Sequence, residues 1–408
     1  MRVLIVSQYF YPENININNV AKLLQTHGHS VEVLTGKPNY PSGKYFKGYG
    51  FFSKIASYDD NMTIFRVPIL PRGKRFRSIG LSLNYLSFIV SASLLSPFLL
   101  RKRNFDIIFV YGTSPILKTI PAIFISKIKR VPLVLWVQDL WPESIVSSGF
   151  YLPKFILSFI DYIVRFIYRS CDLVLCQSRG FVSEINKKMP SLKVGFLPNT
   201  ISNLFEDTAK ENPLPKELEH IKDTFKIIFT GNIGEAQSLQ TALTALSITN
   251  KKSSIKFSLI LVGSGSKTEE LKGLAKKLHL DNVYFLGQHP LNMMPSFIQN
   301  SDLLLISLKK ARIFQITIPN KLQSYLLSGK PIAGSLDGEG AEIINSSKSG
   351  IAVSSEDSEA LSNAFINLAN LTSEERSVMG DNGLKFFKNN YSDEIFLKSL
   401  DKYFEGLV

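Results

Sequence analysis

The chain has 408 residues, of which 45% are hydrophobic, and it carries a formal net charge of +13. This length exceeds what one hydrophobic core usually serves, so the sequence predicts two domains. The two cysteines, Cys171 and Cys176, are too few for a disulfide scaffold and have no metal-ligand spacing, so we expect buried free thiols and no bound metal.

The excess positive charge lies in the first half of the chain. Residues 1–200 contain 25 Lys and Arg against 10 Asp and Glu, whereas residues 201–408 contain 22 against 24. This asymmetry indicates an anionic partner, either nucleic acid or a membrane surface, unless the first half is simply lysine-rich. Because no nucleic-acid-binding motif is present, we expect no nucleic acid. The first residues lack a signal-peptide pattern, which predicts a cytoplasmic protein.

Residues 1–200 alternate strand-like runs with segments of helical spacing. "RVLIVSQYF" (2–10) predicts a buried strand, and "NNVAKLLQTHG" (18–28) predicts a helix that ends on Gly28. Such alternation is typical of a parallel sheet covered by helices on both faces. Segment 36–60, rich in Gly, Pro and Tyr, interrupts it and is predicted to be a functional loop. Further strands are predicted at residues 30–36, 62–68, 105–112, 132–139, 172–178 and 193–199.

The polar segment 206–225, with two prolines, is predicted to be a linker, and the alternation restarts after it. The fold class is therefore α/β, with two Rossmann-like doubly wound domains facing a central cleft. We assign residues 1–203 to the first domain and 204–385 to the second, and expect a helix at 386–408 to pack back on the first. Strands of the second domain are predicted at residues 226–231, 257–263, 283–287, 303–308, 331–336 and 350–355.

Two apolar segments of the first domain could contact a membrane. Residues 78–100 carry no charge and are long enough to span a bilayer, but they contain Asn, Gly, Pro and six Ser, and they lie between two strands of one predicted sheet. We favour a helix packed on the sheet and partly in the membrane interface over a span or a fully buried helix. Residues 152–170 are a second such segment.

The stretch "KIIFTGNIGEAQSL" (226–239) predicts a strand, a glycine turn and a helix that begins near Glu235. Free N–H groups at a helix start, together with the helix dipole, favour a phosphate at such a turn. Gly231, Asn232 and Gly234 are therefore predicted to bind a diphosphate, with an ordinary strand–helix turn as the alternative.

The turn itself carries no cation, so a positive charge should come from elsewhere. Lys321 is the choice, because Pro319 predicts a helix start that places Lys321 in the first turn. The alternative is a solvated lysine. Further cations precede it in the chain at Lys309, Lys310 and Arg312.

Several carboxylates follow predicted strands. Glu339 and Glu342 of "DGEGAEII" are predicted near a helix start, where a carboxylate can accept the hydroxyls of a ribose. Asp139 and Glu143 of "VQDLWPES", and Glu13 after the first strand, could act as a base or bind a hydroxyl. Helix capping is the alternative for Asp139 and Glu13, and ordinary helix-terminal charge is the alternative for Glu339 and Glu342.

The motifs "SQYFYPE", "VLTGKPNYPSGK", "VQDLWPES", "FTGNIGEAQSL", "IPNKLQSYLLSGKPI" and "DGEGAEII" occur in this order over nearly the whole chain. Together they resemble bacterial family 4 glycosyltransferases, and more narrowly the L-fucosamine transferases of O-antigen and capsule synthesis. The resemblance implies the GT-B fold, a nucleotide diphosphate sugar on the second domain and a polyprenyl-diphosphate-linked sugar on the first. It implies no metal and no cofactor beyond the UDP-sugar substrate.

The resemblance also implies site residues. The donor would be held by Gly231, Asn232, Gly234, Gln237, Lys321, Gly338, Glu339 and Glu342, and the acceptor by Tyr11, Asn18, Asn39, Tyr40 and Trp141. Asp139, Glu13, Glu143 and Lys321 would be catalytic.

The sequence departs from the family pattern at two places. The Arg and Lys that many members carry in the glycine turn correspond to Asn232 and Gln237, and the family's paired glutamates correspond to Ile316 and Ser324. We therefore predict that a membrane-associated transferase moves an N-acetyl-L-fucosamine-like sugar from UDP to a lipid-linked acceptor. A UDP-sugar 2-epimerase and a non-catalytic scaffold are the alternatives. The exact sugar, linkage, stereochemical outcome and oligomeric state stay open.

Overall fold

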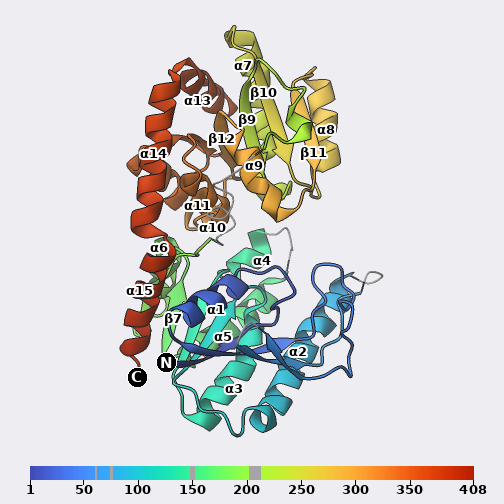
Figure 1. The fold of residues 1–408 in the computed structure, drawn as a ribbon, viewed down its shortest axis with the longest axis vertical. Helices are drawn as coiled ribbons and strands as arrows, with labels where there is room; N and C mark the ends of the chain where they lie inside the picture. Colours follow the sequence, from blue (N-terminus) through green and yellow to red (C-terminus); the bar gives the residue numbers. More distant parts are fainter. Residues whose placement is uncertain (60–61, 74–76, 148–151, 202–212) are drawn as a thin grey trace. The chain divides into compact units, whose positions relative to one another are not determined.

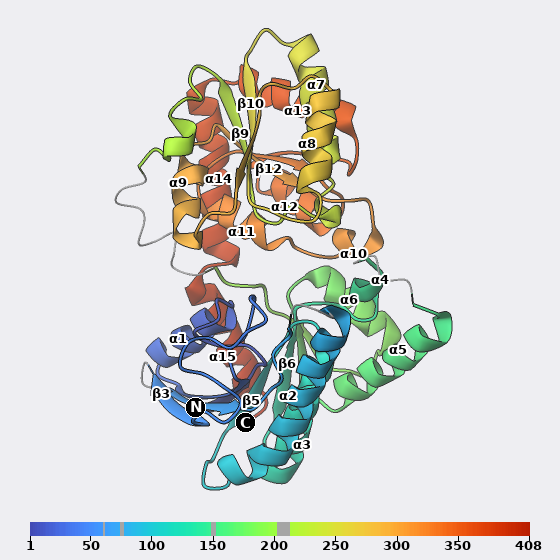
Figure 2. The ribbon, with the colours of Figure 1, turned by 90° about the vertical axis from the view of Figure 1, so that its right-hand side faces the viewer.

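The structure is a computed structural model that describes residues 1–59, 62–73, 77–147, 152–201 and 213–408. The chain forms two compact units (Figures 1 and 2). Unit 1 consists of Met1–Thr200 together with Asp393–Val408, and unit 2 consists of Ile201–Ser392. The chain thus returns to unit 1 at Asp393, whereas we expected this return at 386. The expected boundary at 203/204 and the first part of the linker, 206–212, lie outside the described residues.

Unit 1 is built on a sheet with strand order β3-β4-β2-β1-β5-β6-β7-β8. All its pairs are parallel except β3–β4, so the predicted parallel sheet carries one antiparallel edge strand. Strand β3 falls inside the segment predicted to be a loop. The strands are β1 (Arg2–Val6), β2 (Ser30–Gly36), β3 (Ala56–Asp59), β4 (Met62–Val67), β5 (Ile107–Gly112), β6 (Leu133–Val137), β7 (Leu173–Cys176) and β8 (Val194–Phe196).

Helices cover both faces of this sheet, as the buried apolar strands require. Helix α2 contacts α3, β2 and β4, and α3 contacts β5 and β6, whereas α1 and α15 contact each other on the other face (Figure 2). The helices are α1 (Ile17–Thr26), α2 (Arg77–Leu99), η1 (Ile116–Thr119), α3 (Ile120–Lys129), α4 (Glu143–Ser147), α5 (Lys154–Arg169), α6 (Arg179–Lys188) and α15 (Asp393–Glu405).

The core of unit 1 includes residues from both ends of the chain. Phe396, Leu400 and Phe404 of α15 are buried against the sheet, with Phe404 edge-on to Phe109 of β5. Trp136 of β6 is fully buried and donates its indole N–H to the carbonyl of Leu197 at 2.9 Å. The C-terminal helix therefore supplies one layer of unit 1.

Unit 2 has the strand order β11-β10-β9-β12-β13-β14, and every pair is parallel. This is the order of a doubly wound sheet whose direction reverses between β9 and β12. The strands are β9 (Phe225–Thr230), β10 (Phe257–Val262), β11 (Val283–Gly287), β12 (Leu303–Ser307), β13 (Ile332–Ser335) and β14 (Gly350–Val353). The helices are η3 (Lys216–Leu218), η4 (Glu235–Gln237), α7 (Leu239–Lys252), α8 (Thr268–Lys277), η5 (Leu291–Met293), α9 (Met294–Gln299), α10 (Arg312–Gln315), α11 (Asn320–Leu327), α12 (Glu339–Ser346), α13 (Ser358–Asn370) and α14 (Ser373–Asn390).

Helix α2 is the one helix of the described residues that is long and apolar enough to cross a membrane, judged by length and composition alone. Its stretch Ile79–Leu99 has a mean hydropathy of 1.5, and 22% of it is buried. The buried side includes Asn84, Phe88, Ala92 and Ser96, spaced by four residues, which face the rest of unit 1. Because one side of α2 packs on the sheet in this way, the helix is part of the fold of unit 1.

Candidate active site

A glycine turn joins the ends of β9 and β10 in unit 2. Gly231 has φ +124° and Gly263 has φ +147°, conformations that side chains other than glycine rarely adopt. A Cβ atom on Gly263 would lie 1.8 Å from the carbonyl oxygen of Gly231, so both strands could not end this close together with any other residue. The Gly231 N–H donates to the Val262 carbonyl at 2.8 Å, which fixes the turn.

The helix after this turn begins later than predicted. Residues Glu235–Gln237 form a short 3-10 turn, and α7 starts at Leu239 after Ser238, which has φ +43°. A helical turn does begin at Glu235, but it is 3-10 and three residues long, and the α-helix itself begins only at Leu239. The Gln237 side-chain oxygen accepts from the Gly234 N–H at 3.0 Å and from Asn232 Nδ2 at 3.4 Å, so Gln237 holds the turn itself.

Lys321 lies next to the turn, in the first turn of α11 after Pro319, where the sequence predicts it. Its Nζ is buried and has no hydrogen-bond partner among the described residues. This atom lies 3.5 Å from the centroid of the Phe229 ring and would lie 3.4 Å from a Cβ placed on Gly231. Burial lowers the pKa of Lys321 to about 7. A buried cation without an anion is costly, so its place beside the turn indicates a site for an anionic ligand.

The nearby cation Lys309 already has a partner. Glu235 in the 3-10 turn bonds Lys309 at 2.7 Å and Lys267 at 2.9 Å, and these lysines lower the pKa of Glu235 to about 2. Lys309 is therefore balanced by Glu235, and Lys321 remains the cation of the turn without a counter-charge among the described residues. Lys310 is exposed, and Arg312 begins α10.

The predicted ribose residues lie at the start of α12. Gly338 has φ +71°, and a Cβ there would lie 2.0 Å from the carbonyl oxygen of Gln315, so only glycine allows α12 to approach the end of α10. Glu339 and Glu342 both lie in the first turn of α12, half-buried and exposed respectively. A Cβ on Gly340 would lie 3.3 Å from Pro319, so the starts of α11 and α12 are neighbours. The predicted donor residues are thus brought together at one edge of the sheet.

In unit 1, Glu13 joins two loops at the carboxyl edge of the sheet. Its carboxylate accepts the backbone N–H of Asn39 and of Tyr40 at 2.7 Å each, and that of Phe10 at 3.1 Å. Burial raises the pKa of Glu13 to about 7, although these hydrogen bonds oppose the shift. Glu13 therefore positions the loops after β1 and β2, and its catalytic role stays a prediction.

The predicted acceptor residues Tyr11, Asn18, Asn39 and Tyr40 belong to these same loops. Asn18 donates to the Glu13 carbonyl at 2.7 Å and accepts the Tyr11 N–H at 3.1 Å, which shapes the first loop. Asn39 is fully buried, whereas the Tyr11 side chain is 52% exposed and free to contact a ligand.

Asp139 follows β6 and faces the loop after β5. One of its carboxylate oxygens accepts the backbone N–H and the hydroxyl of Ser114, both at 2.8 Å, and Trp141 donates to the same hydroxyl at 2.9 Å. The second carboxylate oxygen has no hydrogen-bond partner among the described residues, so it can accept from a substrate hydroxyl. The structure therefore brings Asp139 and Trp141 together through Ser114.

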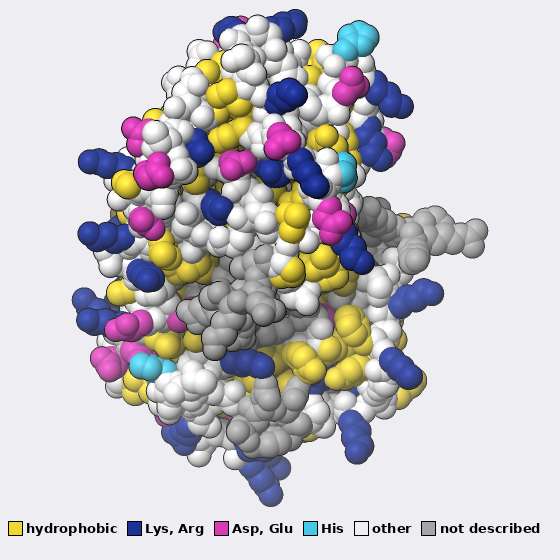
Figure 3. All heavy atoms as spheres, turned by 45° about the horizontal axis from the view of Figure 1, so that its top comes forward, with side chains coloured by type: hydrophobic (Ala, Val, Ile, Leu, Met, Phe, Trp, Pro, Cys, Tyr) yellow, Lys and Arg dark blue, Asp and Glu magenta, His cyan; other side chains and the backbone are white. Residues whose placement is uncertain are grey.

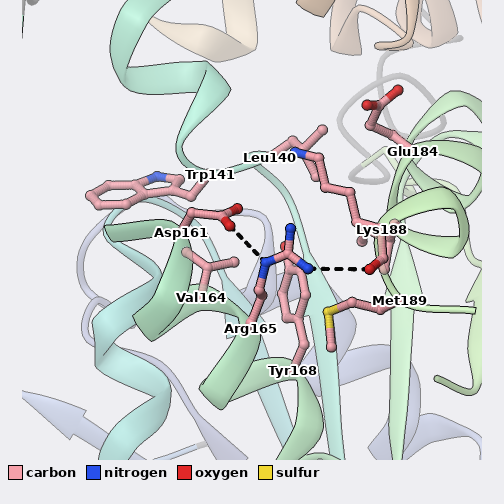
Figure 4. A pocket seen from close by; sticks show the side chains of 10 residues that line it. Leu140, Trp141, Asp161, Val164, Arg165, Tyr168, Glu184, Lys188 and Met189 are labelled. Carbon is pink, nitrogen blue, oxygen red and sulfur yellow. Dashed lines mark hydrogen bonds and ion pairs between the residues drawn. The ribbon is translucent and has the colours of Figure 1, made fainter. Parts of the chain in front are cut away.

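Glu143 begins α4, and its carboxylate pairs with the ammonium of Lys188 on α6. Figure 4 shows the cavity beside this pair, where Arg165 bonds Asp161 at 2.6 Å and the Lys188 carbonyl at 3.2 Å. The cavity holds about 10 Å³, room for about one water and too little for a sugar. Glu143 is thus part of an ion pair, and its catalytic role stays a prediction.

Comparison with known proteins matches both halves of the chain to families. The model described as Glycosyltransferase Family 4 matches residues 16–202, and the one described as Glycosyl transferases group 1 matches residues 210–386. The chain is a glycosyltransferase whose first half resembles family 4 and whose second half resembles group 1.

Individual proteins agree with this assignment. The glycosyltransferase is 24% identical to the probable glycosyltransferase WbjE of Pseudomonas aeruginosa, over 67% of each chain. It is 24% identical to the putative colanic acid biosynthesis glycosyl transferase WcaI of Escherichia coli K12, over 81% of this chain and 82% of the relative. A solved structure described as trehalose-6-phosphate from E. coli bound with UDP-2-fluoro glucose matches with a TM-score of 0.74 at 14% identity, over 100% of both chains.

The fold is therefore GT-B, with two Rossmann-like domains, as the sequence predicts. Both relatives and the matching family are named for sugar transfer, so the epimerase and scaffold alternatives are set aside. Among residues 1–59, 62–73, 77–147, 152–201 and 213–408, no group of three or more His, Cys, Asp or Glu is arranged to hold a metal ion.

Sequence reasoning missed two cations of unit 1, Arg72 and Lys118. Arg72 follows β4, and Lys118 lies in η1, after β5. Lys118 is 2% exposed and bonds the hydroxyl of Thr113. No motif marks either residue; the only available signal is that each cation follows a predicted strand of the sheet.

Proposed function

We propose that this glycosyltransferase moves a sugar from a UDP-sugar to a polyprenyl-diphosphate-linked acceptor, in the synthesis of a bacterial surface polysaccharide such as O-antigen or capsule. The observation that carries the donor assignment is the buried Nζ of Lys321 beside the Gly231 turn, without a partner among the described residues. A matching structure is described as bound with UDP-2-fluoro glucose, which supports UDP as the nucleotide.

The chemistry follows from where charge develops. As the bond between sugar and diphosphate breaks, negative charge grows on the leaving diphosphate, and the Lys321 ammonium stabilises it. The turn at Gly231, Asn232 and Gly234 lies beside that ammonium. The N–H groups of Gly231 and Gly234 donate within the protein, so of these three residues Asn232 offers its backbone N–H to the diphosphate. Of the two first-turn carboxylates we assign Glu339 to the ribose hydroxyls, because it is half-buried and Glu342 is exposed.

The acceptor assignment rests on unit 1. Asp139 has one carboxylate oxygen fixed by Ser114 and the other available to orient or deprotonate an acceptor hydroxyl. The Trp141 indole beside it offers a flat apolar surface on which a sugar ring can stack. The N-acetyl-L-fucosamine identity of the transferred sugar rests on the motif resemblance, and the polysaccharide role also on the naming of one relative for colanic acid biosynthesis.

We further propose that the enzyme is cytoplasmic and associates peripherally with the inner face of the membrane. Large apolar side chains of α2, α3 and α5 are exposed at helical spacing in the unit that carries the excess positive charge. On the face drawn in Figure 3, apolar side chains gather in patches and Lys and Arg stand out from the surface. The exposed residues are Ile79, Leu83, Leu86, Val90, Leu94 and Phe98 of α2, Phe124 and Ile128 of α3, and Phe155, Phe159, Tyr162 and Phe166 of α5.

Thermal unfolding with UDP, GDP and dTDP, each at the same excess, tests the donor assignment. A ligand bound only by the folded state at a hundredfold excess over its Kd stabilises by about 2.7 kcal/mol. We expect UDP to raise the melting temperature more than the other two. A larger shift with GDP or dTDP would replace the donor, and no shift with any of them would contradict the site. Transfer from UDP-N-acetyl-L-fucosamine to a lipid-linked sugar then tests the reaction.

A further inference from the structure

We propose that Arg72 and Lys118, arranged around Tyr9, form a subsite in unit 1 for a phosphate group, and that this group is the diphosphate of the lipid carrier next to the acceptor sugar. Only the identification of the phosphate as part of the acceptor rests on the proposed function. The subsite itself rests on contacts within unit 1.

The three residues come from neighbouring strand ends. Tyr9 follows β1, Arg72 follows β4, and Lys118 follows β5, and the sheet order places β4, β2, β1 and β5 side by side. All three therefore lie at the carboxyl edge of the sheet, beside the point between β1 and β5 where the strand order reverses. Ligands of open α/β sheets bind at this point.

Aromatic rings hold Arg72 in place. Its guanidinium carbon lies 5.0 Å from the ring centroid of Tyr9, 4.7 Å from that of Tyr40 and 5.8 Å from that of Tyr85. Two of its nitrogens donate to the Tyr9 hydroxyl, at 2.5 and 3.2 Å. These are its only hydrogen bonds among the described residues, so the remaining N–H groups of this half-buried side chain can donate to a ligand.

Lys118 adds a second cation at the same ring. Its Nζ lies 5.8 Å from the Tyr9 centroid, and within the described part of the chain its one hydrogen-bond partner is the Thr113 hydroxyl. An ammonium has three donors, so two remain for a ligand. The pKa of Lys118 is lowered to about 7, chiefly by burial; Asp139 opposes this shift and Arg72 adds to it.

The carboxylates of this region do not pair with either cation in the described contacts. Glu13 accepts three backbone N–H groups, and the hydrogen bonds of Asp139 come from Ser114. After the next strand, β6, the side-chain amide nitrogen Nε2 of Gln138 is also buried without a partner among the described residues. Several donors at one edge of the sheet are thus unfilled, and no acceptor of the described protein fills them.

Unfilled donors on separate loops fit an anion with several oxygens. Phosphate and diphosphate offer more acceptor positions than a carboxylate, and both Arg and Lys bind them readily. A carboxylate of an acidic sugar could fill the same donors only in part. We therefore assign the subsite to phosphate.

Titration calorimetry with inorganic pyrophosphate tests the subsite. The background is the full-length Lys321→Met protein, because this change removes the donor-side cation that pyrophosphate could also bind. We expect measurable binding, weakened about tenfold or more by adding Lys118→Met or Arg72→Gln. Lys102→Met is the matched control, because it removes one exposed cation between α2 and β5, at the opposite edge of the sheet, and should change nothing.

Three results would overturn the assignment: no pyrophosphate binding to Lys321→Met, equal binding by all variants, or binding of glucuronate but not pyrophosphate. Arg72→Gln keeps the test valid if the buried Lys118→Met variant does not fold, which circular dichroism would detect. UDP stabilisation of Lys118→Met and Arg72→Gln in an otherwise wild-type chain separates this proposal from the donor assignment. That shift should persist, because unit 2 is unchanged.

Discussion

Lys321 has a buried ammonium and no counter-charge among the described residues. Its substitution should therefore raise the stability of the free protein and weaken the binding of UDP. Replacing it with Met keeps the unbranched side chain to within one atom of its length but removes the desolvated charge. We expect Lys321→Met without ligand to be more stable by about 1–3 kcal/mol, while stabilisation by UDP is lost and turnover falls at least a hundredfold. Thermal unfolding with and without UDP measures both effects, and Lys276→Met, an exposed site on α8, is the control. If UDP stabilised Lys321→Met as much as wild type, Lys321 would not be part of the donor site.

The lowered pKa of Lys321 predicts a pH dependence. Its folded-state pKa is about 7, below the ordinary value of 10.5. Between these values the unfolded chain binds more protons, so this lysine makes stability rise with pH, by up to about 1.4 kcal/mol per unit. The destabilisation by the buried charge is complete below about pH 7 and absent above pH 10.5, the ordinary pKa of the unfolded chain. The difference in unfolding free energy between wild type and Lys321→Met should therefore shrink from pH 7 to pH 10, whereas a constant difference would contradict the burial.

UDP binding should be coupled to protonation of Lys321. If the diphosphate requires the charged ammonium, UDP must bind together with a proton above pH 7, and its affinity falls by up to about tenfold per pH unit. Calorimetry in two buffers of different ionisation enthalpy measures this proton directly.

Replacing two glycines of unit 2 by alanine should change the free energy of unfolding in opposite directions. Gly263→Ala places a Cβ 1.8 Å from the Gly231 carbonyl at a φ of +147°, so we expect a loss of about 1–3 kcal/mol and of UDP stabilisation. Gly273→Ala lies inside α8 with open space around it, so a gain of about 0.5–1 kcal/mol is expected. Urea unfolding of both variants measures the pair, and a tolerated Gly263→Ala would refute the tight turn.

At the scale of elements, α2 has a buried side that belongs to the fold and an exposed apolar side that does not. Leu94→Asp changes the exposed side, where Leu94 is 65% exposed. We expect binding to anionic vesicles to weaken about tenfold or more, because an apolar side chain no longer enters the interface. Val378→Asp on α14, 58% exposed in unit 2, is the matched control. Equal vesicle flotation by both variants would argue against α2 as a membrane contact. The free energy of unfolding of each variant should lie within about 0.5 kcal/mol of the wild-type value.

The elements show why most of the fold is readable from the sequence. Strands such as β5 and β6 are apolar runs buried on both faces, and this pattern predicts a parallel sheet directly. Strand β3 was missed because "ASYD" has no apolar run and pairs only at the antiparallel edge. The start of α7 was placed too early because a 3-10 turn and an α-helix share their polar first residues, and the φ of +43° at Ser238 leaves no mark in the sequence.

The site was predicted less completely, because burial and pairing are properties of the folded chain. The glycine turn and the position of Lys321 after Pro319 follow local rules and were predicted. That Glu143 pairs with Lys188 and that Arg72 meets three tyrosines depend on residues that are separated in the sequence. Local patterns carry no information on such contacts.

At the scale of the whole molecule, unit 1 depends on the last helix of the chain. Phe404→Ala removes a fully buried ring that packs on Phe109, and we expect a loss of about 3–5 kcal/mol from unit 1. Glu405→Ala, exposed on the same helix, should be nearly neutral. Hydrogen exchange measured by mass spectrometry should show faster exchange in β5 and β6 for Phe404→Ala, with unit 2 unchanged. Equal loss of protection in both units would mean that α15 stabilises the chain as a single cooperative block.

Because α15 completes unit 1, the order of assembly on the ribosome differs from the order of the sequence. Domains generally fold as they emerge, starting from the N-terminus. Here the first unit to emerge lacks Phe396, Leu400 and Phe404 until after unit 2 has been synthesised, because unit 2 is continuous from Ile201 to Ser392. All residues of unit 2 are therefore synthesised before unit 1 is complete. Until α15 is synthesised, part of the sheet of unit 1 stays uncovered. A chain that stops before residue 393 lacks the layer that closes unit 1, so translation through α15 is itself a condition for a complete unit 1.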